Sequence, residues 1–535
     1  MKTIIRTASA LLLGAALIIS CEKKQDPVTY TMTADRTSIS DVAANNPSDE
    51  TLVLKTNATS WLVLTPDWVT ATPNSGAGSE NGTIITLKIA SNYKNEATDT
   101  APRSGVLKFS GSGATLDIPV NQLGHTAVID PNASIGGITD LGEFQDFVTA
   151  VNEGNGLSRW LNADGEVELL ADIDLASVTD WTPIGNVTAT GNGNTASKPE
   201  GPVFSGTFNG GGHTIKNFKA STVIPAGGTW GLFGCTMNAT IKNLILEADV
   251  TLEAAETADA GVLVGTAYST TIQSVQVKGK VNVKGSQTND KRFAIGGIAG
   301  FVFSIAADGV SYDSTIKDCV VDLAVTGNSG ANVKNGATGV HFGGIAGFCT
   351  NPKDDSRNHI EDCTFQGSLN IDCGRCAGIA GVGNFGTIFK GCVNNANQVN
   401  GFANGREAGV VCVIAEQCAI IDCVNNGNLT TTDAKTHAGG LFTLLNHATC
   451  YVEGGANYGT ILCAFETDDQ GRRFAGLVGA NFSKFDHVSG VTVSGKIGTD
   501  ANNIADVNAG NFMDYIGYRV EGADEKISNL NYVAK

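Results

Sequence analysis

The chain has 535 residues, of which 42% are hydrophobic and 16% are charged, and its formal net charge is −18 at pH 7. A chain of this length can bury more than one hydrophobic core, and its 66 glycines favour short strands with tight turns over helices. The acidic balance and the absence of a clustered Lys/Arg segment exclude nucleic acid as an expected partner.

The first segment, residues 1–20, is predicted to be an export signal. Lys2 and Arg6 precede an apolar run over residues 8–19 that is too short to span a bilayer. The run ends in Ser20-Cys21, which resembles the bacterial lipobox. The resemblance implies cleavage before Cys21 and acylation of that cysteine, and several acyl chains, at about 0.8 kcal/mol per buried methylene, form an essentially permanent anchor. A simple secretory signal with a chance cysteine is the alternative.

Residues 21–27 would then form a lipidated tether, with the outer membrane as the partner of the acyl chains. Outward-facing lipoproteins of some bacteria tend to carry an acidic stretch directly after the acylated cysteine. The segment Glu22-Lys23-Lys24-Gln25-Asp26 fits this only in part. We therefore expect an outer-membrane lipoprotein that faces the cell exterior.

Residues 28–124 are predicted to form an immunoglobulin-like β-sandwich. Short runs that alternate apolar and polar residues, such as 84–89 and 116–120, are separated by turn-forming clusters. The segments Pro66-Asp67-Trp68-Val69 and Pro119-Val120-Asn121-Gln122-Leu123-Gly124 are similar to those of BACON domains, a family at the front of surface proteins of gut Bacteroidetes. The family was named for suspected carbohydrate or mucin binding, and a spacer role is the alternative.

Two tryptophans of this module, Trp61 and Trp68, are candidate ligand-binding residues. An aromatic face suits the apolar face of a pyranose ring, so either side chain could stack on a sugar. The competing interpretation is that both tryptophans fill the core of the sandwich.

Residues 125–136 are predicted to be a linker, and the second module, 137–535, is expected to begin with a short helix at 140–152. Asp140, followed three residues later by Glu143, gives a start typical of a capping box. The apolar residues of this segment fall on one face at helical spacing: Phe144, Phe147, Val148 and Val151.

From residue 231 onward the sequence repeats two phrases. The glycine phrase Gly231-Leu232-Phe233-Gly234 returns as Gly344-Ile345-Ala346-Gly347, and Ile316-Lys317-Asp318-Cys319 returns as Ile360-Glu361-Asp362-Cys363. Recurring phrases of this kind indicate a solenoid, in which each unit buries its apolar side against its neighbours. Short apolar runs between glycines favour parallel strands stacked coil on coil, in about eleven coils.

The glycine phrases resemble the GLUG motif, and they look like the right-handed β-helix of bacterial surface adhesins. The predicted fold class is therefore all-β: an immunoglobulin-like β-sandwich followed by a right-handed parallel β-helix with an N-terminal capping helix. The helix would cover the first coil and block edge-to-edge aggregation.

Repeat positions also suggest roles for cysteines and aspartates. Four cysteines occupy the position that Leu244 holds in another repeat, so they are expected inside the solenoid as small apolar residues, with inter-coil disulfides as the alternative. Three aspartates share a second repeat position and are expected to form an outer polar row, to cap turns, or to bind an ion. The two sets are Cys319, Cys363, Cys392 and Cys423, and Asp318, Asp362 and Asp422.

Two acidic pairs in hydrophilic stretches are the other candidate binding residues. Asp354-Asp355 has Lys353 and Arg357 nearby, and Asp468-Asp469 is followed by Arg472 and Arg473. A lyase would need acidic residues that converge on a cation, and a glycosidase would need two carboxylates across a cleft, whereas adjacent carboxylates on a loop are usually just solvated. The stretch 381–386 matches GxGxxG by spelling but has no βαβ context, and the sequence has no Walker-type, GxSxG or HExxH motif, so we predict no catalytic residue, no metal and no cofactor.

The sequence thus predicts a non-catalytic cell-surface lipoprotein that binds a polysaccharide or a host glycoprotein. An exported lyase or glycosidase is the alternative, and a structural or fimbria-like component is the third interpretation. Insertions in a solenoid project to one face, so the longer excursions are the expected contact loops: 304–314, 328–341, 350–358 and 466–473.

Overall fold

The computed structural model describes most of the chain from residue 29 to residue 533. The described ranges are 29–94, 100–125, 136–188, 191–192, 195–196, 199, 201–254, 256–285, 291–307, 310–328, 339–352, 356–402, 405–445, 449–464, 474–481, 486–507, 516–518 and 527–533. The chain divides into two compact units, of which the first ends at His125.

The first unit is a β-sandwich built from one mixed sheet, in the order β2-β7-β6-β3-β5-β4, with β1 on β3. Along β3, buried and exposed side chains alternate from Leu54 to Thr59 and again from Ser60 to Leu64, as expected for a strand with one face on a core. The core contains Leu52, Leu107 and Ile118. The strand bounds are β1 (Met32–Ala34), β2 (Ile39–Val42), β3 (Glu50–Leu64), β4 (Val69–Thr72), β5 (Ser75–Ile89), β6 (Arg103–Gly111) and β7 (Ala114–Gln122).

The second unit begins with the predicted helix, α1 (Leu141–Glu153), followed by a 3-10 turn, η1 (Ser158–Trp160). Asp140 is the N-cap, and its carboxylate accepts a hydrogen bond from the Glu143 backbone N–H at 3.0 Å. Phe147 lies edge-on to Phe204, 5.9 Å between ring centroids, so the helix packs on the first coil of the solenoid.

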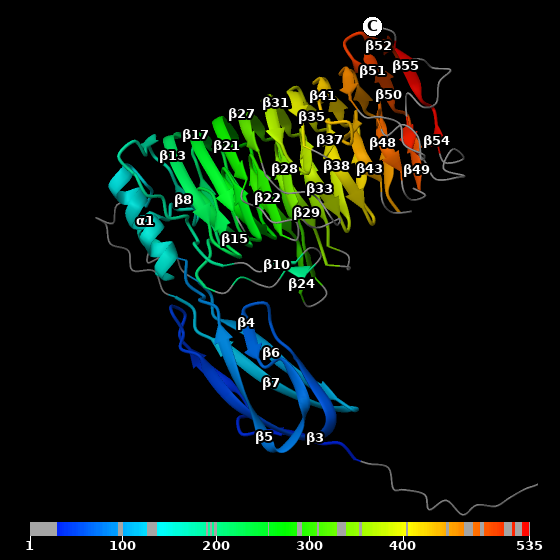
Figure 1. Ribbon diagram of the computed structural model, residues 1–535. Coiled ribbons are helices and arrows are strands. Elements are labelled where there is room, and N and C mark those ends of the chain that lie inside the picture. The colour runs from blue at the N-terminus through cyan, green and yellow to red at the C-terminus, as the bar shows by residue number, and fades with distance from the viewer. Residues whose placement is uncertain are drawn as a thin grey trace, which may run out of the picture. The chain divides into compact units, whose positions relative to one another are not determined.

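The rest of the unit is a stack of parallel sheets that forms a β-helix-like solenoid, as predicted (Figure 1). A typical coil supplies one strand to each of four sheets, here numbered 1 to 4 in the order in which the chain visits them. Among the described residues, sheet 1 has eleven strands, which matches the predicted number of coils. Figure 1 shows α1 at one end of the stack and the last strands at the other.

Sheet 1 contains β8 (Val167–Glu168), β12 (Thr207–Asn209), β16 (Thr240–Lys242), β20 (Thr271–Gln273), β26 (Ser314–Lys317), β30 (Asn358–Glu361), β34 (Thr387–Lys390), β39 (Ala419–Ile421), β44 (Tyr451–Glu453), β49 (His487–Ser489) and β54 (Ile527–Ser528). Sheet 2 contains β9 (Ile173–Asp174), β13 (Thr214–Ile224), β17 (Ile245–Ala254), β21 (Gln276–Gly285), β27 (Val320–Asn328), β31 (Thr364–Asp372), β35 (Val393–Asn394), β36 (Asn397–Asn400), β40 (Val424–Asn425), β41 (Leu429–Thr431), β45 (Ala456–Asn457), β46 (Ile461–Cys463), β50 (Thr492–Ser494), β51 (Lys496–Asp500), β52 (Asn503–Asp506) and β55 (Asn531–Val533).

Sheets 3 and 4 consist almost entirely of buried residues. Sheet 3 contains β14 (Thr229–Trp230), β18 (Ala258–Gly261), β22 (Arg292–Gly296), β28 (Gly339–Gly343), β32 (Arg375–Ala377), β37 (Arg406–Ala408), β42 (His437–Gly439) and β47 (Phe474–Ala475). Sheet 4 contains β15 (Phe233–Met237), β19 (Val264–Tyr268), β23 (Ala299–Phe303), β29 (Ala346–Thr350), β33 (Ala380–Asn384), β38 (Val411–Ala415), β43 (Phe442–Leu445), β48 (Val478–Asn481) and β53 (Ile516–Tyr518). Two small hairpins lie apart from the four sheets: β10 (Gly191–Asn192) with β11 (Thr195–Ala196), and β24 (Ile305–Ala307) with β25 (Val310–Tyr312).

The two repeated phrases are the corners of the coils. The glycine phrase turns the chain from sheet 3 into sheet 4. At this corner the next coil is very close: a Cβ added at Gly344 would lie 2.1 Å from the carbonyl oxygen of Gly378 in that coil. The second phrase turns the chain from sheet 1 into sheet 2 through a left-handed residue, a conformation in which Asp and Asn are enriched. The repeated aspartates are such corner residues, with φ between 50° and 53°: Asp318, Asp362 and Asp422.

The twelve cysteines that follow Cys21 are all buried free thiols. Cys319 and Cys363 lie in neighbouring coils, because the Thr364 N–H donates to the Cys319 carbonyl at 2.8 Å. Each of these thiols donates to the carbonyl two residues earlier, on Lys317 and Glu361, at 3.2 Å. The repeated cysteines therefore fill the interior and satisfy turn carbonyls.

We expect these twelve thiols to be inert in the folded protein and to titrate in full after denaturation. Burial keeps a thiol reagent out and disfavours the reactive thiolate, as at Cys412, where burial raises the pKa to about 12. The measurement is the thiol count with an aromatic disulfide reagent, with and without denaturant. A denatured count well below twelve would contradict free thiols and favour inter-coil disulfides.

Candidate ligand-binding groove

An open groove of about 470 Å³ crosses the outer face of sheet 2. Its lining comes from five neighbouring strands: β13, β17, β21, β27 and β31. Because these strands lie side by side, the groove crosses them and follows the stack of coils. The lining residues are Asn217, Lys219, Glu247, Ala248, Asp249, Lys278, Gly279, Asp322, Ala324 and Gly367.

Two glycines inside the strands allow the close backbone approach beneath the groove. Gly279 and Gly367 have φ values of +128° and +111°, in the left-handed region that side chains rarely adopt. A Cβ at Gly279 would lie 1.9 Å from the carbonyl oxygen of Ala248, its register partner in β17. A glycine within a strand marks a bulge or a close backbone approach, and both occur at ligand sites.

Charges along the groove alternate from coil to coil. Glu247, Lys278 and Asp322 are register partners in three successive strands. Two further partners, Lys219 and Asp249, form a second row with the same alternation. Lys278 Nζ lies 2.9 Å from Glu247 Oε1, with both side chains about half exposed. Opposite charges on neighbouring strands stabilise the register, and they offer a ligand both hydrogen-bond donors and acceptors.

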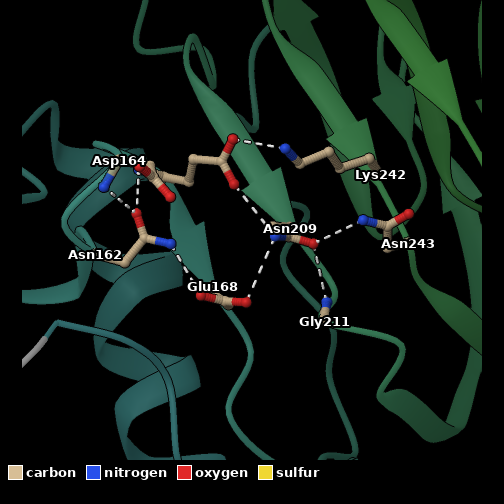
Figure 2. A network of polar contacts seen from close by, with 8 residues as sticks. Asn162, Asp164, Glu168, Asn209, Gly211, Lys242 and Asn243 are labelled. Carbon is tan, nitrogen blue, oxygen red and sulfur yellow. Dashed lines mark hydrogen bonds and ion pairs between the residues drawn. The ribbon is translucent and has the colours of Figure 1, made fainter.

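A second polar cluster lies on the first coils of sheet 1 (Figure 2). Lys242 Nζ lies 2.6 Å from Glu166 Oε1, and the Asn209 amide donates to Glu166 Oε2 at 3.2 Å. The Asn162 amide donates to Glu168 Oε2 at 2.9 Å. Figure 2 shows that the labelled side chains of Asn162, Glu168 and Asn209 point toward one another, from the loop before β8, from β8 and from β12.

This cluster supports a structural role better than a catalytic one. Both glutamates accept hydrogen bonds from neighbouring side chains, and the Glu166–Lys242 pair is about one-fifth exposed. A glycosidase needs two carboxylates that face a substrate across a cleft, one of which gives up a proton. Glu166 and Glu168 are instead held by Lys242 and two amides, and they tie the loop after η1 to the first coils.

His487, on the outer face of sheet 1 near the C-terminal end, lies between two carboxylates. Its Nε2 is 2.9 Å from Glu453 Oε1 and its Nδ1 is 3.0 Å from Asp486 Oδ2, and its ring stacks on Tyr451 at 5.0 Å. Partial burial lowers the pKa of His487, but the hydrogen bonds to Asp486 and Glu453 outweigh it, so the pKa is raised above 6.5.

We expect His487 to stabilise the last coils at acidic pH and to lose this effect as the pH rises. Because its pKa is raised in the folded state, the contribution is complete below the unfolded pKa of 6.5 and disappears as the pH passes the raised folded value. The side chain is 35% exposed, so screening limits the effect to less than about 1 kcal/mol. The measurement is the Tm of His487→Gln against wild type at pH 5.5 and 8.5, and an equal difference at both would contradict it.

The structure separates the two candidate tryptophans. Trp61 is 3% exposed, and its indole N–H donates to the Ala77 carbonyl at 3.0 Å, so it is a core residue with no free face for a sugar, which corrects its place among the candidate ligand-binding residues. Trp68 is half-buried against the same core, and the Arg103 guanidinium lies 4.5 Å from its ring centroid. One face of Trp68 is therefore already occupied by a cation–π contact.

The other predicted site residues lie outside the described residues. These are Cys21, Asp354, Asp355, Asp468, Asp469, Arg472 and Arg473. Of the expected contact loops, the described part of 304–314 includes the hairpin of β24 and β25. The sequence did not reveal the groove, because its lining residues come from five strands that are far apart in the sequence and meet only on the face of the sheet. The one local signal for it was Gly279, a glycine between Lys278 and Lys280 inside an alternating strand pattern.

Within the described ranges, no group of three or more His, Cys, Asp or Glu side chains is placed to hold a metal ion. In the same ranges, no helix has the length and apolarity needed to cross a membrane.

Comparisons with known proteins include a family match to the first unit. Residues 55–123 match the BACON family, whose description reads "Putative binding domain, N-terminal". Halomucin of Haloquadratum walsbyi is 33% identical over an alignment of 183 positions, which covers 30% of this chain and only 2% of that relative.

Two solved structures are similar to larger parts of the chain. A Bacteroides ovatus protein named a "putative immunoglobulin A1 protease" is 21% identical and aligns over 65% of this chain and 84% of its own, with a TM-score of 0.37. An IgA1 protease is 11% identical over 89% of this chain and 29% of its own, also with a TM-score of 0.37. With the fold, the family match shows that the chain joins an N-terminal BACON domain to a parallel β-solenoid.

Proposed function

We propose that the protein is a non-catalytic, lipid-anchored protein of the outer membrane that faces the cell exterior and binds a glycan, free or on a host glycoprotein. The observation that carries this proposal is the groove on sheet 2, which is open, continuous over five coils and lined by charged side chains from four of them. The BACON domain, described as a binding domain, supports a binding role. In finer detail, we propose that the solenoid is a right-handed β-helix of the GLUG type.

The lining favours binding over catalysis. Glu247 is ion-paired with Lys278, so its carboxylate is already held as an acceptor rather than presented as a general acid. Acidic and basic side chains alternate instead of converging on one point, where a scissile bond would have to sit. Such a surface suits many weak hydrogen bonds along a ligand.

The experiment is to apply the purified full-length chain, in detergent, to a glycan array and to a panel of plant and host polysaccharides. Retention without new reducing ends or unsaturated products is the expected result. Turnover would favour the lyase or glycosidase alternative. If neither assay shows binding or turnover of a glycan, the proposal is contradicted and a structural surface component is favoured.

The anchor and the orientation are tested separately in cells. We expect Cys21→Ala to abolish incorporation of labelled fatty acid and to release the protein from the membrane fraction, whereas Cys21→Ser would show whether the sulfur itself is needed. Protease applied to intact cells should remove the protein. Full protection would place it on the periplasmic side of the outer membrane.

A further inference from the structure

We propose that the groove takes an extended, linear, uncharged glycan that lies along the stack of coils, with about one sugar unit per coil. This inference rests on the proposed binding function and specifies the ligand of the same site. It follows from three properties of the groove: its direction, its repeat and its charge.

The direction and the repeat come from the strands. Lining residues on five neighbouring strands, from Lys219 on β13 to Gly367 on β31, extend the groove over four strand spacings. At about 4.8 Å per spacing, it is about 19 Å long. Each of the first four strands adds at least one charged side chain to the lining, and β31 adds Gly367. A polymer whose own repeat is close to this spacing stays in phase along the whole groove, and an extended β-linked pyranose chain has such a repeat.

An extended peptide fits the groove less well. Its residues repeat every 3.3 to 3.4 Å, so it drifts out of phase with the coils after a few residues. Peptides that bind to sheets usually add a strand at an exposed edge, where backbone groups are free. Here the lining belongs to interior strands of sheet 2, whose backbone groups pair with the neighbouring coils, as β21 does with β17 and β27.

The charges favour a neutral ligand. The lining has three carboxylates, on Glu247, Asp249 and Asp322, against two lysines, and the whole chain has a net charge of −18. A polyanion would meet repulsion from both the groove and the surrounding field. A sugar hydroxyl donates and accepts, so it can use a carboxylate in one coil and an ammonium in the next.

The test is a length series of neutral, linear oligosaccharides with two to eight units, from the gluco, xylo and manno series. Kd is measured by calorimetry on the full-length chain in detergent. For at least one series we expect Kd to fall with each added unit up to about four or five units, the number of coils that line the groove, and then to level off. Affinity that is independent of length, or that still rises at eight units, would overturn the inference.

Two matched pairs of variants test whether the ligand binds in the groove. Ala324→Trp fills the groove from β27, and Thr326→Trp adds the same side chain to the same face two residues further on, outside the lining. We expect the first to weaken binding at least tenfold and the second to leave it unchanged. Lys278→Met and Lys284→Met make the same comparison on β21. Equal effects within both pairs would exclude the groove as the site.

The outcomes separate this inference from the proposed function. If the glycan array shows ligands but none of the three neutral series binds, or if only charged polymers bind, the inference fails and the binding function stands. If no glycan binds in any format, the proposed function fails. Circular dichroism and Tm of each variant verify that it is folded before its Kd is compared.

Discussion

Replacing Asp259 by alanine is expected to destabilise the solenoid by about 3–5 kcal/mol, because it leaves a buried arginine without its counter-ion. Asp259 Oδ1 and Oδ2 lie 2.7 and 2.9 Å from Arg292 Nη2, and both residues are 3% exposed. The Thr266 hydroxyl donates to the same carboxylate at 3.3 Å. The Arg292 guanidinium lies 4.3 Å from the ring centroid of Phe301, a contact that replaces little of the lost attraction.

The control removes both charges. Asp259→Leu with Arg292→Met keeps apolar volume and leaves no uncompensated ion, so we expect it to be closer to wild type than Asp259→Ala alone. The readout is hydrogen exchange in β18 and β22, because a solenoid opens locally rather than all at once. If the double variant is as unstable as the single one, shape complementarity and not charge holds this region.

The sequence predicted the corners of the coils well because each corner imposes its residue type locally. Asp318 and Asp422 occupy a left-handed position that suits Asp, Asn or Gly, and Gly344 sits where the next coil leaves no room for a side chain. A requirement of this kind repeats in every coil. It therefore leaves a recurring phrase in the sequence, from which the solenoid and its number of coils could be predicted.

The groove and the buried ion pair depend instead on how distant segments align. Lys278 faces Glu247, and Arg292 reaches Asp259, only because the chain returns to a neighbouring strand of the same sheet one coil later, 31 and 33 residues further on. The residues alone suggest exposed charges in each case. Trp61 is the opposite case, because a residue that the sequence allowed to be exposed is buried. An aromatic residue in an alternating strand suits a core and a binding face equally well, so the sequence alone could not decide between them.

Gly344→Ala is expected to destabilise the solenoid by about 3 kcal/mol or more. The new Cβ would lie 2.1 Å from the carbonyl oxygen of Gly378 and 2.3 Å from a ring carbon of Phe365. The first contact is backbone of the next coil, so it can be relieved only by separating two coils that share four sheets. The strain should spread along the stack, and we expect the Tm to fall and exchange to rise in β28 and β32.

The matched control is a glycine at the other kind of corner, where the chain passes from sheet 1 into sheet 2. Gly490 has φ +70°, and the nearest atom to an added Cβ is 3.5 Å away. The equivalent corner residue in other coils is Asn243 or Asn529, with φ near 55° and 52°. Gly490→Asn should therefore be within about 0.5 kcal/mol of wild type, because asparagine tolerates this conformation and restricts the unfolded chain more than glycine does. If both variants are equally tolerated, close contact between coils does not explain the glycine phrase.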